Sequence, residues 1–252
     1  MSNTPPGPTD PGTSLGSLQS LTNANCPTTR GTAFDARNGQ IYYVQKINDS
    51  GGTGVHLCWM QSNLRYAGGG NWESGWGWAD DRKTLTATTS GSTAWTNNTA
   101  NVHTNIGGSA DYTDTNANGG FYGFLYNWCA AMGGQTNACN ESSTTGFDTA
   151  VSICPAGWRL PTGEVTTGEF RHLNNTINSG SSSSPAGLIS NWLAVYAGVY
   201  SSGLSSASLG YYWSSTVDNA TNTRNLGFGA TSGVSPAISL NKILGLSVRC
   251  VR

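Results

Sequence analysis

The sequence predicts an α+β domain with a β-hairpin first, two helices in the middle and short strands at the end. Two runs of β-branched and aromatic residues indicate the hairpin, and apolar residues at helical spacing indicate the helices. The 252 residues suffice for one large domain or two small ones. Residues 1–33 are rich in Pro, Gly, Ser and Thr and predict an arm, so the domain is expected over 34–252.

The hairpin is predicted from the runs 39–47 and 55–60, which the turn-forming residues 48–52 separate. Residues 66–120 are rich in Gly, Trp, Asn and Thr and show little apolar alternation. They predict a long, ordered insertion in which tryptophans form small local cores. Those tryptophans are Trp72, Trp76, Trp78 and Trp95.

The first helix is predicted over about 121–132. Its apolar residues, Phe121, Leu125, Trp128 and Met132, follow the spacing i, i+4, i+7 and i+11, which places them on one helix face. The two glycines at 133 and 134 are expected to end it.

The second helix is expected after the segment 154–162. Thr166 and Glu169 have the spacing of a capping box at its start. Its apolar face would carry Phe170, Leu173 and Ile177.

The chain after the second helix predicts a flexible break over 179–185 and then a meander of short strands. The expected strands are 192–199, 211–215, 225–228 and 243–251.

Charged residues are scarce, at 10% of the chain against roughly 25% in an average soluble domain. The tracts 84–110 and 173–217 contain none. Ser, Thr, Asn and Gly must therefore cover the surface, which is common outside cells and on virus particles. The net charge of −1 gives no basic surface for nucleic acid or acidic lipid.

The chain shows no apolar run of the ~20 residues that cross a bilayer, and no direct membrane insertion is expected. Residues 1–8 lack the basic and apolar regions of a secretory signal. Either the chain is trimmed or it reaches its location by another route, for example inside a virion. The expected location is a cell surface, the extracellular space or a virion.

Six cysteines allow 15 pairings, and none forms a C-x-x-C pair that would indicate zinc. The pairing we expect joins Cys129 to Cys139 as a local loop and Cys154 to Cys250 over a long range, which leaves Cys26 to Cys58. The alternative is buried free thiols in a reducing compartment.

Residues 114–119 match the opening of a calcium loop, but Leu125 stands where the closing Glu is required. An Asn-rich turn is the simpler interpretation, and an irregular calcium site near Asp111–Asn118 stays open. His56, His103 and His172 have no evident carboxylate or nucleophile partner. No catalytic residue, resident metal or cofactor is therefore predicted.

The most informative stretch is the polar segment within residues 211–241, which lies between an aromatic strand and the final cysteine-bearing strand. Tyr, Asn, Ser, Gly and Arg are the residue types that adaptable binding loops use. Such a segment on a rigid scaffold predicts a ligand-binding surface. The alternative is a solvated loop without a partner.

Three motifs resemble known proteins: Cys154–Thr162 (CPAGWRLPT), Tyr212–Ser215 (YWSS) and Val248–Val251 (VRCV). Together they resemble the Fibrobacter succinogenes major paralogous domain, a family of bacterial surface modules. They also resemble the variable proteins of diversity-generating retroelements, in which a reverse transcriptase rewrites adenines near the 3′ end of the gene. The resemblance covers about residues 38–252 and implies a C-type-lectin-like fold.

The resemblance implies that the last two motifs are scaffold and that a variable segment over about 211–241 faces the ligand. Asn codons randomised at adenine cannot encode Lys, Glu, Gln, Met or Trp, and between Ser214 and Leu246 only Lys242 is of these types. The expected partner is a protein or glycan on another cell or surface. The implied ligand-facing residues are Tyr211, Asp218, Asn219, Thr221, Asn222, Arg224, Asn225 and Asn241.

Two alternatives follow from the same comparison. A structural or adhesive module of a cell envelope or virion would share the scaffold without clustered variation. Formylglycine-generating enzymes resemble the chain distantly, but they need two reactive cysteines near the C-terminus, where only Cys250 stands. The calcium-binding E-P-N and Q-P-D motifs of sugar-binding lectins are absent from the sequence.

Overall fold

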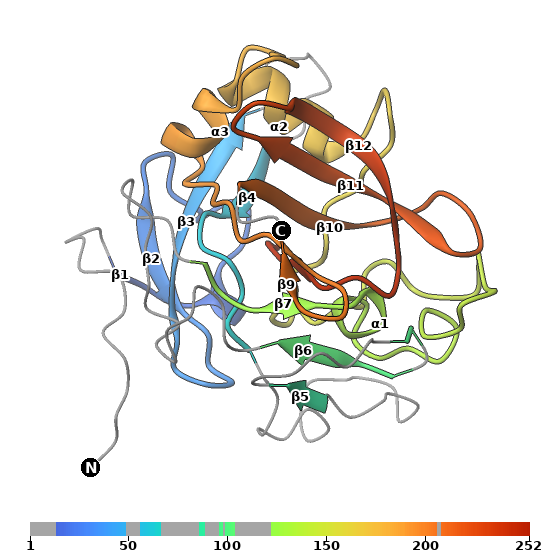
Figure 1. Ribbon diagram of the computed structural model, residues 1–252. Coiled ribbons are helices and arrows are strands. Elements are labelled where there is room, and N and C mark those ends of the chain that lie inside the picture. The colour runs from blue at the N-terminus through green and yellow to red at the C-terminus, as the bar shows by residue number, and fades with distance from the viewer. Residues whose placement is uncertain are drawn as a thin grey trace.

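The computed structural model describes residues 14–48, 56–66, 86–88, 96–97, 99–103, 122–205 and 208–252. Figure 1 shows strands through most of the molecule. A four-stranded sheet has the order β1-β2-β3-β4. Its strands are β1 (Ser14–Ser17), β2 (Gly31–Phe34), β3 (Ile41–Asn48) and β4 (His56–Met60).

A seven-stranded sheet has the order β12-β11-β10-β13-β7-β6-β5, and β8 pairs with β9 separately. The earlier strands are β5 (Thr86–Thr88), β6 (Asn101–His103), β7 (Leu125–Tyr126), β8 (Val199–Tyr200) and β9 (Leu204–Ser205). The later ones are β10 (Leu209–Val217), β11 (Asn222–Gly229), β12 (Gly233–Asn241) and β13 (Leu246–Ser247).

The helices of the described residues are short. They are the 3-10 turn η1 (Leu18–Ser20) and the α-helices α1 (Trp128–Ala131), α2 (Glu169–Ile177) and α3 (Ala186–Asn191). None is long and apolar enough to span a bilayer. In Figure 1, α2 and α3 lie together at the top, and α1 lies apart from them, lower on the right.

The predicted hairpin of 39–47 and 55–60 is confirmed as β3 and β4, which pair antiparallel from Val44↔Met60 to Asn48↔His56. The other edge of β4 meets the C-terminus of the chain. The Met60 N–H donates to the Cys250 carbonyl at 3.0 Å, and Trp59 bridges to Val251. The terminal strands of the domain therefore meet, as the sequence predicts.

The sheet of β10, β11 and β12 separates two apolar clusters. Successive side chains of a strand point to opposite faces, and at Tyr212 and Trp213 of β10 both faces are covered. Tyr212 belongs to the cluster under α2 and α3, where it stacks on Phe228 at 6.0 Å. Trp213 belongs to the other cluster, and its indole N–H donates to the Tyr126 carbonyl at 2.5 Å.

The disulfides of the structure are Cys26–Cys58, Cys129–Cys139 and Cys154–Cys250, and no cysteine is free. The predicted pairing is thus confirmed. The third bond joins residues 96 positions apart in sequence and fixes the C-terminal segment after β13 to the segment before α2.

The predicted helix over 121–132 is wrong for most of its length. Leu125 and Tyr126 form β7, which lies between β13 and β6, and the helix begins only at Trp128. Gly123 prevents an earlier start, because its φ is +66° and a Cβ there would lie 2.5 Å from the Asn63 Cβ. The apolar spacing arises instead from a segment that is buried on all sides.

The second predicted helix is confirmed as α2, with a different cap. Gly168 occupies the N-cap position, and Thr162 takes the role expected of Thr166. The Glu169 N–H donates to Thr162 Oγ1 at 3.0 Å, and the Thr162 N–H donates to Glu169 Oε2 at 2.8 Å. A bond of Arg159 to the same carboxylate raises the pKa of Arg159.

The expectation of an α+β, C-type-lectin-like fold built on two helices is wrong: most of the regular secondary structure of the described residues is β-strand. The strands predicted at 211–215 and 225–228 are confirmed within β10 and β11. The rest of the polar segment, expected to be a loop, belongs largely to β11 and β12. Conversely, most of the strand predicted over 192–199 is irregular. α3 begins at Ala186, directly after the predicted break at 179–185.

Part of the predicted N-terminal arm is folded. From Ser14 onward the chain forms β1, η1 and β2, and Leu18 and Leu21 are buried in the larger cluster. The tryptophans predicted as local cores at 72, 76, 78 and 95 lie outside the described residues.

Candidate functional site

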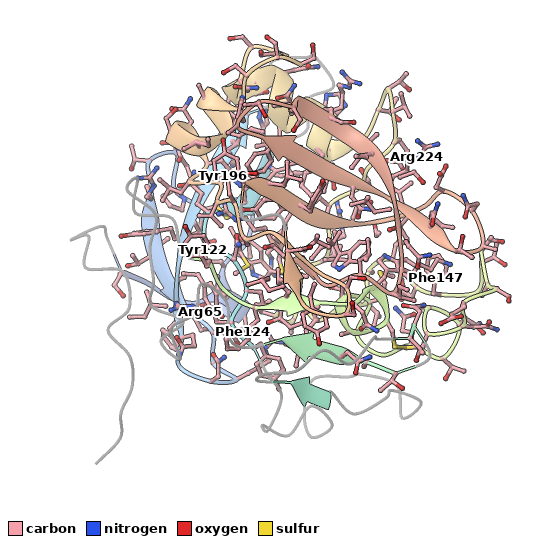
Figure 2. The ribbon with its side chains drawn as sticks, viewed as in Figure 1. Arg65, Tyr122, Phe124, Phe147, Tyr196 and Arg224 are labelled. Carbon is pink, nitrogen blue, oxygen red and sulfur yellow. A yellow bond between two sulfur atoms is a disulfide. The ribbon has the colours of Figure 1, made fainter. Side chains whose placement is uncertain are left out.

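The predicted ligand-facing residues lie mostly at the outer end of the β10–β11–β12 sheet. Asn222 and Arg224 are partly exposed on β11, whereas the alternate residues Thr223 and Asn225 are fully buried. Figure 2 shows Arg224 near the edge of the molecule, at the upper right. Because alternate side chains of a strand face opposite ways, one face of β11 meets solvent here and the other meets the core.

An ion pair organises the exposed face. The Arg224 guanidinium contacts the Asp218 carboxylate, and the two side chains are 33% and 19% exposed. Ser239 donates to the other oxygen of Asp218 at 2.6 Å, and Arg224 also donates to the Ala237 carbonyl at 3.3 Å. Arg224 and Ser239 are direct partners in the β11–β12 register. Both side chains are partly exposed to solvent, so we expect the pair to contribute about 0.2–1 kcal/mol.

Asn219 builds the turn between β10 and β11. Its side-chain oxygen accepts the backbone N–H groups of Thr221 and Asn222, both at 3.0 Å. The backbone adds a bond from the Asp218 N–H to the Asn222 carbonyl at 3.0 Å. Asn219 and Thr221 are exposed. The turn is therefore ordered by a side chain that also faces solvent.

Lys242 supports this turn from the buried side. Its side chain is buried, and Nζ donates to the carbonyl oxygens of Ala220 at 2.6 Å and Ser143 at 2.7 Å. It also lies 5.1 Å from the Trp128 ring. Removal from water lowers the pKa of Lys242.

A small pocket of about 220 Å³ opens beside the turn. Thr221 and Asn241 line it from the hairpin, together with Glu141, Lys242 and Ile243. Asn241 is the register partner of Asn222, which joins the pocket to the exposed face of β11. We name the exposed set the hairpin surface. It consists of Asp218, Asn219, Thr221, Asn222, Arg224, Ser239 and Asn241.

Two predicted residues do not belong to the hairpin surface. Asn225 is fully buried opposite Trp213; its Nδ2 donates to the Thr223 carbonyl, and its Oδ1 has no hydrogen-bond partner among the described residues. It cannot face a ligand in this structure. Tyr211 lies seven positions before Asp218, roughly 20 Å along the strand. Its ring is half-buried over Gly227, and this burial raises its pKa.

Sequence reasoning missed Ser239, Glu141 and the role of Lys242. The alternation of β12 could have revealed Ser239, since Asn241 was already assigned to the same face. The contact of Lys242 with Ser143 spans 99 positions, and no local pattern signals it.

The remaining sequence candidates contribute nothing to this surface. The calcium-like segment 111–118 and the side chain of His103 lie outside what the structure describes. His56 is exposed on β4 and His172 is half-buried on α2. No cluster of three or more His, Cys, Asp or Glu side chains suited to a metal occurs among the described residues.

Residues 55–252 match the Fibrobacter succinogenes major domain, a span from just before β4 to the C-terminal end of the sequence. No curated protein and no solved structure matches the chain.

Proposed function

The chain belongs to the Fibrobacter succinogenes major domain family, and from this premise we propose that it is a receptor-recognition protein. Its hairpin surface binds a ligand, and a retroelement diversifies that surface. The observation that carries the proposal is the alternation along β11. Asn222 and Arg224 face solvent while Thr223 and Asn225 are buried, so the exposed side chains can change without altering the core.

The positions of the resembling motifs support this division. Tyr212, Trp213, Ser214 and Ser215 are buried, as is the whole of Val248–Val251. These motifs resemble those of retroelement variable proteins, in which fixed residues hold the backbone and others vary. The proposal therefore assigns the motifs to the scaffold and the polar residues between them to recognition.

Side chains of the hairpin surface can be replaced at little cost in folding stability. Exposed substitutions usually change stability by less than ~0.5 kcal/mol. The hairpin backbone is also fixed by β11 pairing on both sides and by Lys242 below the turn. A preordered backbone spares the ligand complex the cost of ordering a loop, about 0.5–1.5 kcal/mol per immobilised side chain.

We propose a protein or glycan on another cell or surface as the partner. The hairpin surface is polar, with amide, hydroxyl and paired charged groups, and polar surfaces of this kind recognise both classes. The location we propose is a cell surface, the extracellular space or a virion. Three disulfides favour an oxidising compartment.

Two other functions compete with this proposal. A structural or adhesive surface module would use the same disulfide-bonded scaffold with a constant hairpin surface. An enzyme of the formylglycine-generating type would need a reactive Cys250 thiol, whereas Cys250 is bonded to Cys154. We therefore propose binding as the activity, without a catalytic residue or cofactor.

Sequencing the gene across its source population tests the proposal. We expect substitutions concentrated in codons of the hairpin surface, and a near-copy of the 3′ end of the gene beside a reverse transcriptase gene. Codons for Trp213 and Asn225 serve as internal controls, because both side chains are buried. A uniform distribution of substitutions over exposed positions would favour the constant surface module instead.

A further inference from the structure

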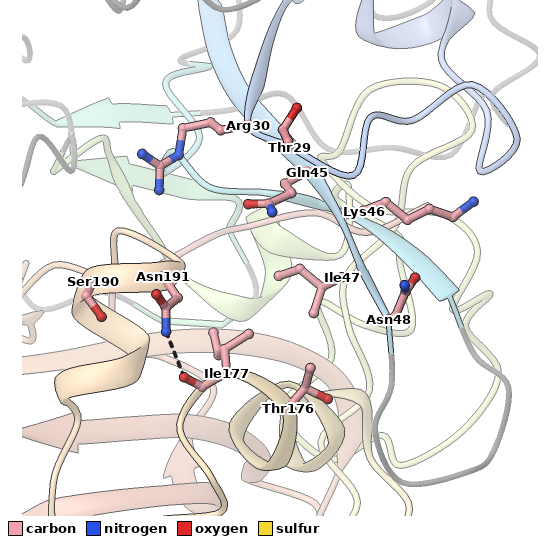
Figure 3. A pocket seen from close by; sticks show the side chains of 10 residues that line it. All are labelled: Thr29, Arg30, Gln45, Lys46, Ile47, Asn48, Thr176, Ile177, Ser190 and Asn191. Carbon is pink, nitrogen blue, oxygen red and sulfur yellow. Dashed lines mark hydrogen bonds between the residues drawn. The ribbon is translucent and has the colours of Figure 1, made fainter.

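A larger groove, of about 620 Å³, lies away from the hairpin surface. Its walls come from four parts of the chain: the residues before β2, the end of β3, the end of α2 and the end of α3 (Figure 3). In Figure 1, β3 and α3 lie on one side of the molecule and the β10–β11 turn lies on the other. No residue of the hairpin surface lines the groove.

The buried side chain of Gln61 joins three walls of the groove. Its Nε2 donates to Gln45 Oε1 at 2.7 Å and to the Asn191 carbonyl at 3.1 Å. Its Oε1 accepts the Arg30 Nε–H at 2.7 Å. Gln61 is fully buried, so these bonds have little competition from water. Asn191 Nδ2 further ties the end of α3 to the Ile177 carbonyl at 3.0 Å, the dashed line in Figure 3. The groove is therefore formed before any ligand arrives.

Arg30 is held with its outer nitrogens available. Gln61 takes the Nε–H, and the guanidinium lies 5.7 Å from the centre of the Tyr43 ring. Nη1 and Nη2 have no hydrogen-bond or carboxylate partner among the described residues. A fixed guanidinium with two free terminal nitrogens is the group that binds a carboxylate through two parallel hydrogen bonds.

The charge of the groove is positive on its Arg30 side. Arg30 and Lys46 line it, and none of its lining residues is acidic. In Figure 3 the Lys46 side chain points away from Arg30. Lys46 therefore adds to the positive potential of the groove and does not contact the same ligand group as Arg30. The Arg30 charge is also among the causes that lower the pKa of the buried Arg249 to about 10, after desolvation.

The other end of the groove offers acceptors and hydroxyl groups. Thr176 and Ile177 end α2, and Ser190 and Asn191 end α3, so both helices place their carbonyl ends at the groove. The Ile177 and Asn191 carbonyls each accept one side-chain N–H already, and each oxygen has a second lone pair. Helix C-termini carry partial negative charge and accept hydrogen bonds from hydroxyl donors. Ile47 and Ile177 supply apolar surface.

We propose that this groove binds an oligosaccharide that carries a carboxylate, with Arg30 as the carboxylate-binding residue. The carboxylate contacts the free edge of the guanidinium, and the sugar hydroxyls contact the amides, hydroxyls and helix carbonyls beyond it. The volume lies within the roughly 300–1,000 Å³ of small-molecule sites.

Two other anionic ligands fit less well. An extended acidic peptide would bind by adding a strand, but β3 is already paired with β2 and β4 on its two edges. A phosphate dianion would meet two helix C-termini, whose partial charge opposes it. A sugar residue whose carboxylate carries a single charge meets Arg30 with that group, and the hydroxyls of the oligosaccharide meet the helix ends.

Calorimetry with three acidic oligosaccharides tests the proposal: trigalacturonate, 3′-sialyllactose and a hyaluronan tetrasaccharide. We expect at least one to bind, and its methyl ester to bind far more weakly. Arg30→Gln should weaken binding about 10- to 100-fold, the effect of losing a charged bidentate contact. Arg30→Lys keeps the positive charge but removes the planar pair of N–H donors, so it should also weaken binding. The thermal midpoint of each variant is measured to show that it is folded.

Arg171→Gln is the matched control, because Arg171 lies on α2 outside the groove and donates to the Val165 carbonyl. Its affinity should equal that of the unchanged chain, as should that of Asn222→Ala on the hairpin surface. Absence of binding by all three sugars overturns the proposal. The proposal is also overturned if the acid and its methyl ester bind equally, or if inorganic phosphate binds as tightly as the sugars. It is overturned as well if folded Arg30→Gln keeps the affinity of the unchanged chain. None of these outcomes bears on diversification of the hairpin surface.

Discussion

The ammonium group of Lys242 donates to the carbonyl oxygen of Ala220 at 2.6 Å, so a buried charge fastens the β10–β11 turn to the core. Replacing Lys242 by Met keeps the length of the side chain and removes its donors. The carbonyls of Ala220 and Ser143 then lose this partner, which we expect to cost about 1–3 kcal/mol. Urea unfolding measures the loss.

Lys46→Met is the control for Lys242→Met. Lys46 is half-exposed on β3, so its replacement should change stability by less than ~0.5 kcal/mol. Equal effects of the two substitutions would show that Lys242 does not hold the turn.

Trp213 and Asn222 distinguish the scaffold from the hairpin surface. Trp213→Ala removes a fully buried ring and its bond to the Tyr126 carbonyl, and should cost about 3–5 kcal/mol. Asn222→Ala removes a partly exposed side chain and should cost less than ~0.5 kcal/mol. Thermal and urea unfolding provide the comparison. A loss at Asn222 as large as that at Trp213 would show that this part of β11 is structural.

The disulfides should differ in their contribution to stability. Cys154 and Cys250 are 96 positions apart, whereas Cys129 and Cys139 are 10 apart. Loop-closure entropy gives about 4.7 kcal/mol for the long loop and somewhat less than ~3 kcal/mol for the short one. Replacing each pair by Ala and measuring unfolding tests this order. The reverse order would indicate that packing, and not chain entropy, dominates.

Tyr126 should make the protein less stable in alkali. Burial raises the pKa of Tyr126 well above 10, and it also raises the pKa of Tyr42. Above about pH 10 the unfolded chain releases these protons while the folded chain retains them, so the free energy of unfolding falls as pH rises. Urea unfolding between pH 8 and 11 measures the slope. Tyr126→Phe should flatten it, and an unchanged slope would contradict the assignment.

The parts of the fold that the sequence predicted are those with local signals. The β3–β4 hairpin, α2 and the disulfide pairing follow from short patterns. The 121–132 segment misled because a stretch buried on all sides carries apolar residues at helical spacing by coincidence. No helix runs through Gly123, whose φ is +66°. β11 was predicted only over 225–228, because the buried residues before that stretch, Thr223 and Asn225, are polar where a strand core is usually aliphatic. β12 was missed.

The candidate site was predicted in outline only. Asp218, Asn219 and Arg224 lie close together because a turn of four residues joins their strands, and the polar composition signalled that turn. The burial of Asn225 depends on which face of β11 meets Trp213, and this follows from strand pairing that composition does not encode. The groove at Arg30 depends on Gln61, which brings together residues 30, 45 and 191.

Asn219 should be the least variable residue of the hairpin surface. Its side-chain oxygen accepts the N–H groups of Thr221 and Asn222, so exposure alone does not make it replaceable. Asn219→Asp keeps that acceptor and should change stability by less than ~0.5 kcal/mol, whereas Asn219→Ala loses both bonds and should cost about 1–2 kcal/mol. Urea unfolding compares the two variants. If they are equally stable, the turn does not depend on this side chain, and population sequences should then show Asn219 varying as freely as Asn222.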